Sequence, residues 1–499
     1  MEQLSLSLKK KINIVSLLLL LILSIAAFLR LYRINDYLTF LGDEGRDVTI
    51  VRRMITELHP ALIGPQTSIG NMYLGPLYYY LMVIPLLIFK FSPIGPAVMV
   101  ACFGTATVGL IFLLTKKWFG NVQAIIASTI YAVSPLPVLY SRSSWNPNIM
   151  PFFALLVIWS IWKFWKEIDL KYLTVAGISF AFVVQSHYLG LLLLPTIIIF
   201  WLITLRDLPS QKQTRKSFVK FSSIGLISFI LLMSPLVFFD IKHGFINFKA
   251  MKAFFTVRQE TVNIKPYKAI PKIWPIYMDI NSSLLAAAHK KAGFVIAITT
   301  LIGLIVGLIL SKYRGPSLLI LSWTVFGLIG LGLYKQNIYE HYYGFLFAIP
   351  FILISLLLGD LWRRNLLGKI LVTVSVLLLA GLNLLWVPIR FSPNLQLQRT
   401  QAISDFINED SPNQDFNLAL IAKRNYDAGY RYFLSLNKAK VVKVEDEIAN
   451  NLYVICEDPI CSPINHPIAE IANFGWAKIS SEWNFPWGVR LFKLVHVQN

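Results

Sequence analysis

Long apolar runs separated by short polar segments make up most of the first 390 residues. Many of these runs come close to the about 20 residues that a helix needs to cross a bilayer. The apolar runs occupy residues 12–32, 76–91, 95–115, 121–140, 150–165, 172–187, 189–205, 218–239, 293–311, 317–334, 343–359 and 368–388. This pattern predicts a mostly α-helical, polytopic membrane protein.

The run at 76–91 is short and contains Pro76 and Pro85, so the run alone does not show whether it crosses the membrane. We therefore use the charges of the other loops to distinguish a span from a surface helix. If it lies along the membrane surface, the basic loops fall on the same side as the N-terminus, as the positive-inside rule requires. These loops are 116–117, 163–171, 206–220, 312–314 and 363–369. We therefore expect about 11 spans, a juxtamembrane helix after the first span, an N-terminus inside the cytoplasmic membrane and a C-terminus outside it.

The N-terminal run from Ile12 to Leu29 is too long for a signal-peptide core, and it lacks a small-residue cleavage site. We interpret it as an uncleaved first span. Lys9, Lys10 and Lys11 would then lie on the cytoplasmic side.

The pattern changes after Pro388, where polar and apolar residues become mixed. Alternating patterns at 416–422, 441–444, 452–456 and 489–495 predict strands, and periodic patterns at 396–408 and 427–437 predict helices. We expect a transmembrane domain over 1–389 and a small extracytoplasmic α/β domain over 390–499. The second domain has 11 basic and 12 acidic residues, so the excess positive charge belongs to the membrane part.

The 499 residues are 56% hydrophobic and 14% charged, with a formal net charge of +20. Most of the positive charge lies in short loops between apolar runs, where Lys and Arg set topology, so we do not expect nucleic-acid binding. Residues 240–292 are an exception, because they are expected outside and carry nine Lys or Arg against three acids. They fit either a solvated loop with surface helices or a surface that attracts phosphate or anionic lipid headgroups.

A polar stretch, 39–47, follows the first span and contains the adjacent acids Asp43 and Glu44 and the nearby Arg46. A carboxylate at the outer membrane edge can act as a general base and take the proton from an attacking hydroxyl. Adjacent side chains of an extended loop point in opposite directions, so one acid can face an acceptor and the other a partner such as Arg46. The stretch also fits a helix start with Asp43 as the N-cap.

Three further polar segments, 141–148, 185–188 and 339–343, emerge on the outer side in this topology, so the groups most suited to chemistry share one face. Cations at span ends can stabilise a phosphate leaving group, although a span-end Arg or Lys also fits a snorkelling anchor. The candidate residues for binding the phosphate or the sugar of a donor are Arg46, Tyr78, Arg142, Asn146, Asn148, His187, Tyr188, Lys335, His341 and Tyr342.

Cys456 and Cys461 flank four residues of the C-terminal domain. Outside the cytoplasm a disulfide between them is chemically allowed. The absence of a second Cys or His pair nearby argues against zinc. Cys102 lies within a span and is interpreted as a packing residue.

The chain resembles the GT-C membrane glycosyltransferases, and more narrowly the family-39, protein O-mannosyltransferase and aminoarabinose-transferase group. The resemblance covers residues 12–205 well and the later spans loosely. It rests on Gly42-Asp43-Glu44-Gly45, on the segment 75–80, on 113–120 at the end of a span, and on Ser134-Pro135 leading to Tyr140-Ser141-Arg142.

The resemblance implies an inverting transfer of a sugar from a polyprenyl-phosphate donor to an acceptor hydroxyl on a glycan, lipid or protein outside the cytoplasm. It implies that Asp43 activates the acceptor and that Glu44 is the second acid of the pair. Relatives often carry an Asp shortly after the Ser-Arg pair, whereas this chain has Asn146 and Asn148 there. We therefore expect no required metal and no other cofactor.

Other functions remain open on the sequence. A transporter or flippase for a lipid-linked sugar would carry ionisable groups within its spans, whereas the candidate residues lie at outer span ends. A ligase or polymerase for surface polysaccharide would also act outside, but the early Asp-Glu loop argues against it. A non-enzymatic scaffold is a further alternative, because fold alone does not fix function.

Overall fold

The computed structural model describes every residue except 1–13, 68–71, 257–261, 264, 459 and 498–499. The chain forms two compact units. The first contains Met1–Tyr32, Ala61–Leu81 and Val98–Ser392. The second contains Arg33–Pro60, Met82–Ala97 and Pro393–Asn499. The second unit therefore contains the segment that follows the first apolar helix together with the C-terminal residues.

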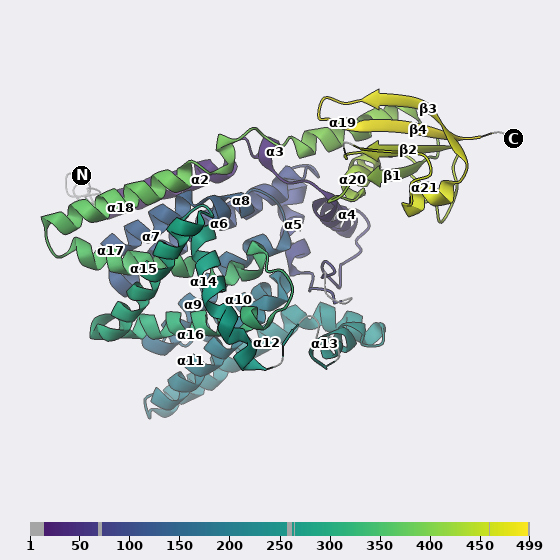
Figure 1. Ribbon diagram of the computed structural model, residues 1–499. Coiled ribbons are helices and arrows are strands. Elements are labelled where there is room, and N and C mark those ends of the chain that lie inside the picture. The colour runs from purple at the N-terminus through teal and green to yellow at the C-terminus, as the bar shows by residue number, and fades with distance from the viewer. Residues whose placement is uncertain (1–13, 68–71, 257–261, 264, 459, 498–499) are drawn as a thin grey trace, which may run out of the picture. The chain divides into compact units, whose positions relative to one another are not determined.

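The first unit is a bundle of apolar helices (Figure 1). Its longer helices are α2 (Ile14–Leu31), α7 (Asn121–Val133), α9 (Met150–Lys166), α10 (Tyr172–Ser186), α11 (Leu194–Asp207), α12 (Lys212–Lys242), α13 (Ile246–Thr256), α14 (Ile270–Leu285), α15 (Lys290–Ile309), α16 (Ser311–Leu333), α17 (Ala348–Trp362) and α18 (Leu366–Leu384). The short elements are α8 (Pro135–Tyr140) and the 3₁₀-helices η1 (Asn146–Ile149), η2 (Tyr188–Leu193), η3 (Pro266–Ala269), η4 (Glu340–Leu346) and η5 (Pro388–Arg390). Residues of α5 (Leu77–Ile88) and α6 (Ile94–Phe119) occur in both units.

Within the described residues, eight helices are long and apolar enough to cross a membrane, or nine if the bent pair η4 and α17 is one span. The sequence pattern predicts about 11, so this count is lower. The difference lies in α7 and α10, whose 13 and 15 residues reach only about 20 Å at 1.5 Å per residue, against about 30 Å of hydrocarbon. Helix α5 has 12 residues with Pro85 inside it, and it is also too short.

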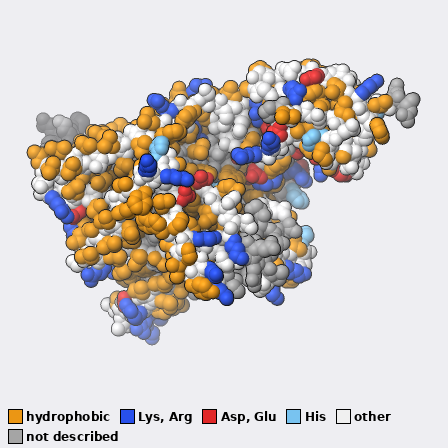
Figure 2. All heavy atoms as spheres, viewed as in Figure 1, with side chains coloured by type: hydrophobic (Ala, Val, Ile, Leu, Met, Phe, Trp, Pro, Cys, Tyr) orange, Lys and Arg blue, Asp and Glu red, His pale blue; other side chains and the backbone are white. Residues whose placement is uncertain are grey.

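Apolar side chains cover much of the visible surface of the helical bundle (Figure 2). Leu377 and Leu378 of α18, for example, are 66% and 68% exposed. A soluble protein seldom exposes apolar patches of this extent, whereas a bilayer accepts them. The first unit is therefore the membrane-spanning part of a multi-span membrane protein.

Three spans follow directly from polar segments through a turn of 3₁₀-helix. Helix η1 leads into α9, η2 into α11 and η4 into α17. Such turns are frequent at helix N-termini because they tighten the first turn. The polar segments 141–148, 185–188 and 339–343 are thereby each held at the start of a long apolar helix.

The second unit contains a four-stranded sheet with the order β1-β2-β4-β3. Its strands are β1 (Asn417–Ile421), β2 (Asn451–Cys456), β3 (Ala477–Asn484) and β4 (Arg490–His496), and its helices are α3 (Ile34–Tyr37), α4 (Gly42–Thr56), α19 (Gln396–Asp410), α20 (Ala428–Leu436) and α21 (Ala469–Phe474). Strand β1 pairs in parallel with β2, which pairs antiparallel with β4, and β4 pairs antiparallel with β3.

Alternating residues of β1 build two separate cores, one on each face of the sheet. Leu418 and Leu420 pack with residues of α19 and α20, such as Ile403. Ala419 and Ile421 pack on the other face with residues of α21. This period of two is what the alternating pattern at 416–422 predicts.

Two elements of this domain differ from the sequence prediction. The pattern at 441–444 forms only an isolated bridge, between Phe416 and Val441, instead of a strand. Strand β3 was not predicted, because most of its side chains are exposed and no apolar face marks it. Its position is set by pairing with β4.

Candidate functional site

Helix α4 begins at the acidic pair. Leu41 is its N-cap, so Asp43 is the second helical residue and not the N-cap that the sequence pattern also allowed. Successive residues of a helix are rotated by about 100°, so the two acids meet different surroundings. The Asp43 side chain is 42% exposed, whereas Glu44 is buried.

The Asp43 carboxylate is held by one of its oxygens. Asp43 Oδ1 accepts hydrogen bonds from Arg46 Nη1 at 2.8 Å and from the Tyr426 hydroxyl at 2.7 Å. Arg46 also binds Oδ1 of the buried Asp47 through Nη2 at 2.7 Å and Nε at 2.9 Å. Within the described part of the chain, Asp43 Oδ2 accepts no hydrogen bond. One oxygen of a half-exposed carboxylate is thus fixed while the other is open to an incoming hydroxyl.

Glu44 has a different role in the local structure. Its Oε2 accepts the backbone N–H of Leu41 at 3.0 Å and so closes the first turn of α4. Burial raises the pKa of Glu44 to about 8, and the nearby carboxylates of Asp43 and Asp47 act in the same direction. Glu44 is therefore mostly protonated at neutral pH, which leaves Asp43 as the acid suited to accepting a proton.

Asn425 and Tyr426 belong to the C-terminal part of the second unit, and neither is among the site residues predicted from the sequence. Asn425 Oδ1 accepts the backbone N–H of Gly42 at 2.9 Å, and Asn425 Nδ2 donates to Glu457 Oε1 at 2.9 Å. In the sequence, these two residues lie in a polar loop directly after the predicted strand 416–422, and this position is the feature that could have indicated a role in the site. Nothing in the sequence linked that loop to Asp43.

Two of the predicted polar segments, 141–148 and 185–188, meet the start of α5 in the first unit. The hydroxyls of Tyr78 and Ser144 are hydrogen-bonded at 2.7 Å, and both side chains are buried. Asn146 Nδ2 donates to the backbone oxygen of Ser186 at 2.7 Å. The segments 76–80, 141–148 and 185–188 therefore form one polar region.

Arg142 and Asn148 bind backbone carbonyls in this structure. Arg142 is buried, and its Nη1 and Nη2 donate to the carbonyl oxygens of Leu29 at 2.6 Å and Tyr32 at 2.7 Å. The last carbonyls of a helix have no partner within the helix, so this guanidinium caps the C-terminal end of α2. Asn148 Nδ2 donates to the backbone oxygen of Ser143 at 3.0 Å.

His341 is the centre of a group of rings that we call the His341 cluster, with Tyr140, Trp145, His187 and Tyr342. The ring centroid of His341 lies 4.5 Å from that of Trp145, 4.6 Å from Tyr342, 5.9 Å from His187 and 6.4 Å from Tyr140. His187, His341 and Tyr342 are among the binding residues predicted from the sequence, whereas Trp145 and Tyr140 are not. Side chains from three polar segments therefore meet at one ring.

The remaining predicted residues lie near these segments. The Tyr188 hydroxyl donates to the backbone oxygen of Tyr73. Lys335 is exposed in the turn that follows α16. The Tyr140 hydroxyl donates to Glu340 Oε2 at 3.4 Å, which brings a carboxylate to the edge of the His341 cluster.

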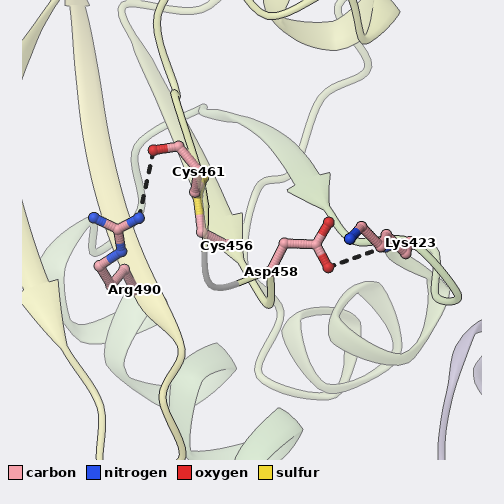
Figure 3. Close-up of a disulfide and its surroundings, with 5 residues drawn as sticks. All are labelled: Lys423, Cys456, Asp458, Cys461 and Arg490. Carbon is pink, nitrogen blue, oxygen red and sulfur yellow. Dashed lines mark hydrogen bonds between the residues drawn. A yellow bond between two sulfur atoms is a disulfide. The ribbon is translucent and has the colours of Figure 1, made fainter.

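Cys456, the last residue of β2, forms a disulfide with Cys461 (Figure 3). Arg490 Nη2 donates to the backbone oxygen of Cys461 at 3.4 Å, which ties the bridge to β4. Among the described residues, no group of three or more His, Cys, Asp or Glu side chains is arranged to hold a metal ion. Metal independence stays a prediction.

A family model, described as dolichyl-phosphate-mannose-protein mannosyltransferase, matches residues 74–238. A putative mannosyltransferase of Bacillus subtilis strain 168, YkcB, is 27% identical over 242 residues. The match covers 46% of this chain, and the chain spans 31% of the length of that relative. The matched family segment contains Tyr78, Arg142 and His187, and it lies after Asp43.

Two solved structures are similar over most of the chain. ArnT from Cupriavidus metallidurans, bound to undecaprenyl phosphate, has a TM-score of 0.62 at 11% identity, and the match covers 95% of this chain and 97% of that one. The archaeal oligosaccharyltransferase AglB from Archaeoglobus fulgidus, in complex with an inhibitory peptide and a dolichol-phosphate, has a TM-score of 0.55 at 13% identity, covering 88% and 69%. The chain therefore has the fold of the GT-C membrane glycosyltransferases, and its residues 74–238 are similar to the dolichyl-phosphate-mannose-protein mannosyltransferase family.

Proposed function

We propose that this protein is a membrane glycosyltransferase that moves a sugar from a polyprenyl-phosphate donor to an acceptor hydroxyl on the outer face of the cytoplasmic membrane, with inversion. The observation that carries the proposal is the Asp43 carboxylate, which offers a free and accessible Oδ2 on a GT-C fold. A carboxylate of this kind suits a general base.

In the proposed reaction, the acceptor oxygen attacks the anomeric carbon of the donor sugar from the side opposite the phosphate. Asp43 Oδ2 takes the proton of that hydroxyl while the bond between the anomeric carbon and the phosphate oxygen breaks. The polyprenyl phosphate leaves with the bonding electron pair. A single displacement of this type inverts the configuration at the anomeric carbon. Glu44, mostly protonated and bound to Leu41, supports the helix start and not the proton transfer.

The donor class is supported by the two solved structures, which were determined with undecaprenyl phosphate and with a dolichol-phosphate. A polyprenyl chain would stay in the bilayer beside the apolar helices of the first unit. The matched family and the Bacillus relative are both described as mannosyltransferases, which supports a hexose as the sugar.

We assign donor recognition to the polar region of the first unit. The rings of the His341 cluster suit contact with the face of a sugar ring, and Glu340 beside them suits a hydrogen bond from a sugar hydroxyl. The same proposal assigns donor recognition to six further polar residues of the first unit, namely Tyr78, Asn146, Asn148, Tyr188, Lys335 and Arg142. Arg46, bound to Asp43 and Asp47, is the cation next to the base.

The proposal is tested in proteoliposomes with a radiolabelled polyprenyl-phosphate sugar and acceptor lipids or peptides. Asp43→Asn keeps the shape of the side chain and removes its basicity, so we expect transfer to fall about 100- to 10,000-fold. The matched control is Asp207→Asn, an exposed acid beside Arg206, which should transfer as fast as wild type. Addition of EDTA should leave transfer unchanged.

Equal rates for Asp43→Asn and wild type, in preparations with the same thermal midpoint, would overturn the assignment of the base. A lipid-linked-sugar transporter would give a different result, because it would move label between leaflets without forming a covalent product. A surface-polysaccharide ligase would accept only a preassembled chain on a lipid carrier.

A further inference from the structure

We propose that the C-terminal domain supplies a positioning residue of the catalytic site, Tyr426, whose hydroxyl orients the Asp43 carboxylate. This inference rests on the proposed function, because it assigns a role to Tyr426 through the proposed base. It also gives the C-terminal domain a role in the chemistry.

The three side chains form a closed set of hydrogen bonds. The Tyr426 hydroxyl donates to Asp43 Oδ1 at 2.7 Å and accepts from Arg46 Nη1 at 3.3 Å, while Arg46 Nη1 also donates to Asp43 Oδ1. Two donors therefore converge on one oxygen from different directions. A carboxylate that accepts one hydrogen bond can still rotate about its Cβ–Cγ bond. Two donors that approach from different directions hold the plane of the carboxylate, and so they fix the direction in which Oδ2 faces.

Tyr426 remains a hydrogen-bond donor at neutral pH. Its pKa is raised well above the ordinary value, chiefly by partial burial of the side chain and further by the hydrogen bond to Asp43. The hydroxyl therefore keeps its proton, and Tyr426 does not compete with Asp43 as a base.

The backbone around Tyr426 is docked closely against the start of α4. A Cβ added at Gly42 would lie 2.3 Å from the Tyr426 ring, and one added at Gly45 would lie 2.3 Å from the backbone nitrogen of Gly429. Real Cβ atoms do not approach other atoms this closely, so a side chain at Gly42 would displace the Tyr426 ring and one at Gly45 would displace the backbone at the start of α20. Asn425 adds a direct bond to the N–H of Gly42, the first residue of α4.

The other end of this contact is also fixed. Arg52 Nη1, three turns along α4, donates to Ser435 Oγ of α20 at 2.8 Å. The Phe40 ring, just before α4, meets the Phe433 ring edge-on with centroids 5.6 Å apart. Helix α4 and helix α20 are thus joined along their length, so the position of Tyr426 relative to Asp43 is determined by many contacts.

Tyr426 itself is 44% exposed. Loss of its hydroxyl alone should therefore cost the fold little, and the ring would still fill the space above Gly42. A purely structural role predicts no change in turnover when the hydroxyl is removed. A positioning role predicts a fall in kcat without a change in the KM for the donor.

The test compares Tyr426→Phe with wild type in the proteoliposome transfer assay. We expect kcat to fall about ten- to hundredfold, because hydrogen bonds to charged groups are among the stronger ones, with the donor KM and the thermal midpoint unchanged. Tyr172→Phe is the matched control, because Tyr172 begins a helix of the first unit and no role in the site is assigned to it. It should turn over as wild type does.

A double variant separates this inference from the proposed function. If Tyr426 acts through Asp43, then Tyr426→Phe should cause no further loss in an Asp43→Asn background. A normal kcat for Tyr426→Phe, or an equal fold-loss in both backgrounds, would overturn the positioning role while leaving Asp43 as the base. A normal rate for Asp43→Asn would instead overturn the proposed base itself.

Gly45→Ala supplies a second route to the same conclusion. The added methyl must push α20 away from α4, so kcat should fall in the same manner as in Tyr426→Phe. Unchanged kcat in Gly45→Ala, with the same donor KM, would show that the docking of α20 is not needed for turnover and would count against the inference.

Discussion

The carboxyl group of Glu44 accepts a hydrogen bond of 3.0 Å from the backbone N–H of Leu41 in a buried position. The pKa of Glu44 is raised from its ordinary value of 4.5 to about 8, first by desolvation and then by the charges of Asp43 and Asp47. The folded chain thus binds more protons than the unfolded chain between these two values. The contribution of Glu44 to stability is therefore greatest below about pH 4.5 and is lost as pH rises through 8.

We predict that Glu44→Gln flattens this dependence. The thermal midpoint of the wild-type protein in detergent should fall between pH 5 and pH 8 more steeply than that of the variant. The control is Glu57→Gln at the end of the same helix, where the side chain is 52% exposed, and its profile should follow that of wild type. Parallel profiles for wild type and Glu44→Gln would show that Glu44 does not titrate in this range.

Arg142 provides a test that distinguishes a structural role from donor binding. Lysine cannot reproduce the two-pronged contact with the carbonyl oxygens of Leu29 and Tyr32. Arg142→Lys should therefore destabilise the protein by about 1–3 kcal/mol, measured as a lower thermal midpoint. The control Arg206→Lys changes an arginine that is 75% exposed and should have no effect. An unchanged midpoint with a raised donor KM would instead support phosphate binding by Arg142.

Gly75 is expected to be intolerant of any side chain. A Cβ there would lie 2.0 Å from Oε1 of Gln185, which accepts the backbone N–H of Leu77 at 3.2 Å. Gly75→Ala must displace this glutamine from the start of α5, at a cost of about 1–3 kcal/mol. Gly381→Ala is the matched control, because among the described residues no atom outside the adjacent backbone of its own helix lies within 4 Å of its Cβ position. Similar thermal midpoints for the two variants would contradict the close contact at Gly75.

The orientation in the membrane is tested by labelling single cysteines with an impermeant maleimide in intact cells. Residues for labelling must be exposed, and Asn413 and Ser210 both meet this condition. In a Cys102→Ala background, Asn413→Cys should label from outside and Ser210→Cys only after the cells are opened. Labelling of Ser210→Cys in intact cells would reverse the predicted topology.

Some properties of the protein follow from the sequence because they depend on the local order of residues. The apolar runs predict a multi-span helical protein because an apolar helix of sufficient length needs no distant partner to be stable in lipid. The alternating patterns at 416–422, 452–456 and 489–495 predict β1, β2 and β4 because each strand has a buried face. The acidic pair at the start of α4 is also visible in the sequence.

Other properties depend on residues that meet only in the folded chain. Asp43 and Tyr426 are separated by 383 positions, and the hydroxyl of a half-exposed loop tyrosine leaves no periodic signal. Glu44 and Asp43 are neighbours in the sequence, but only burial distinguishes the capping acid from the open one. The position of strand β3 likewise depends on its pairing with β4. The lengths of α7 and α10, which are too short to cross a bilayer, depend on packing against other helices. The sequence thus determined that an acidic helix start follows the first membrane span. The tertiary structure decided which acid is accessible and which distant residues hold it, because burial and hydrogen bonding depend on neighbours in space.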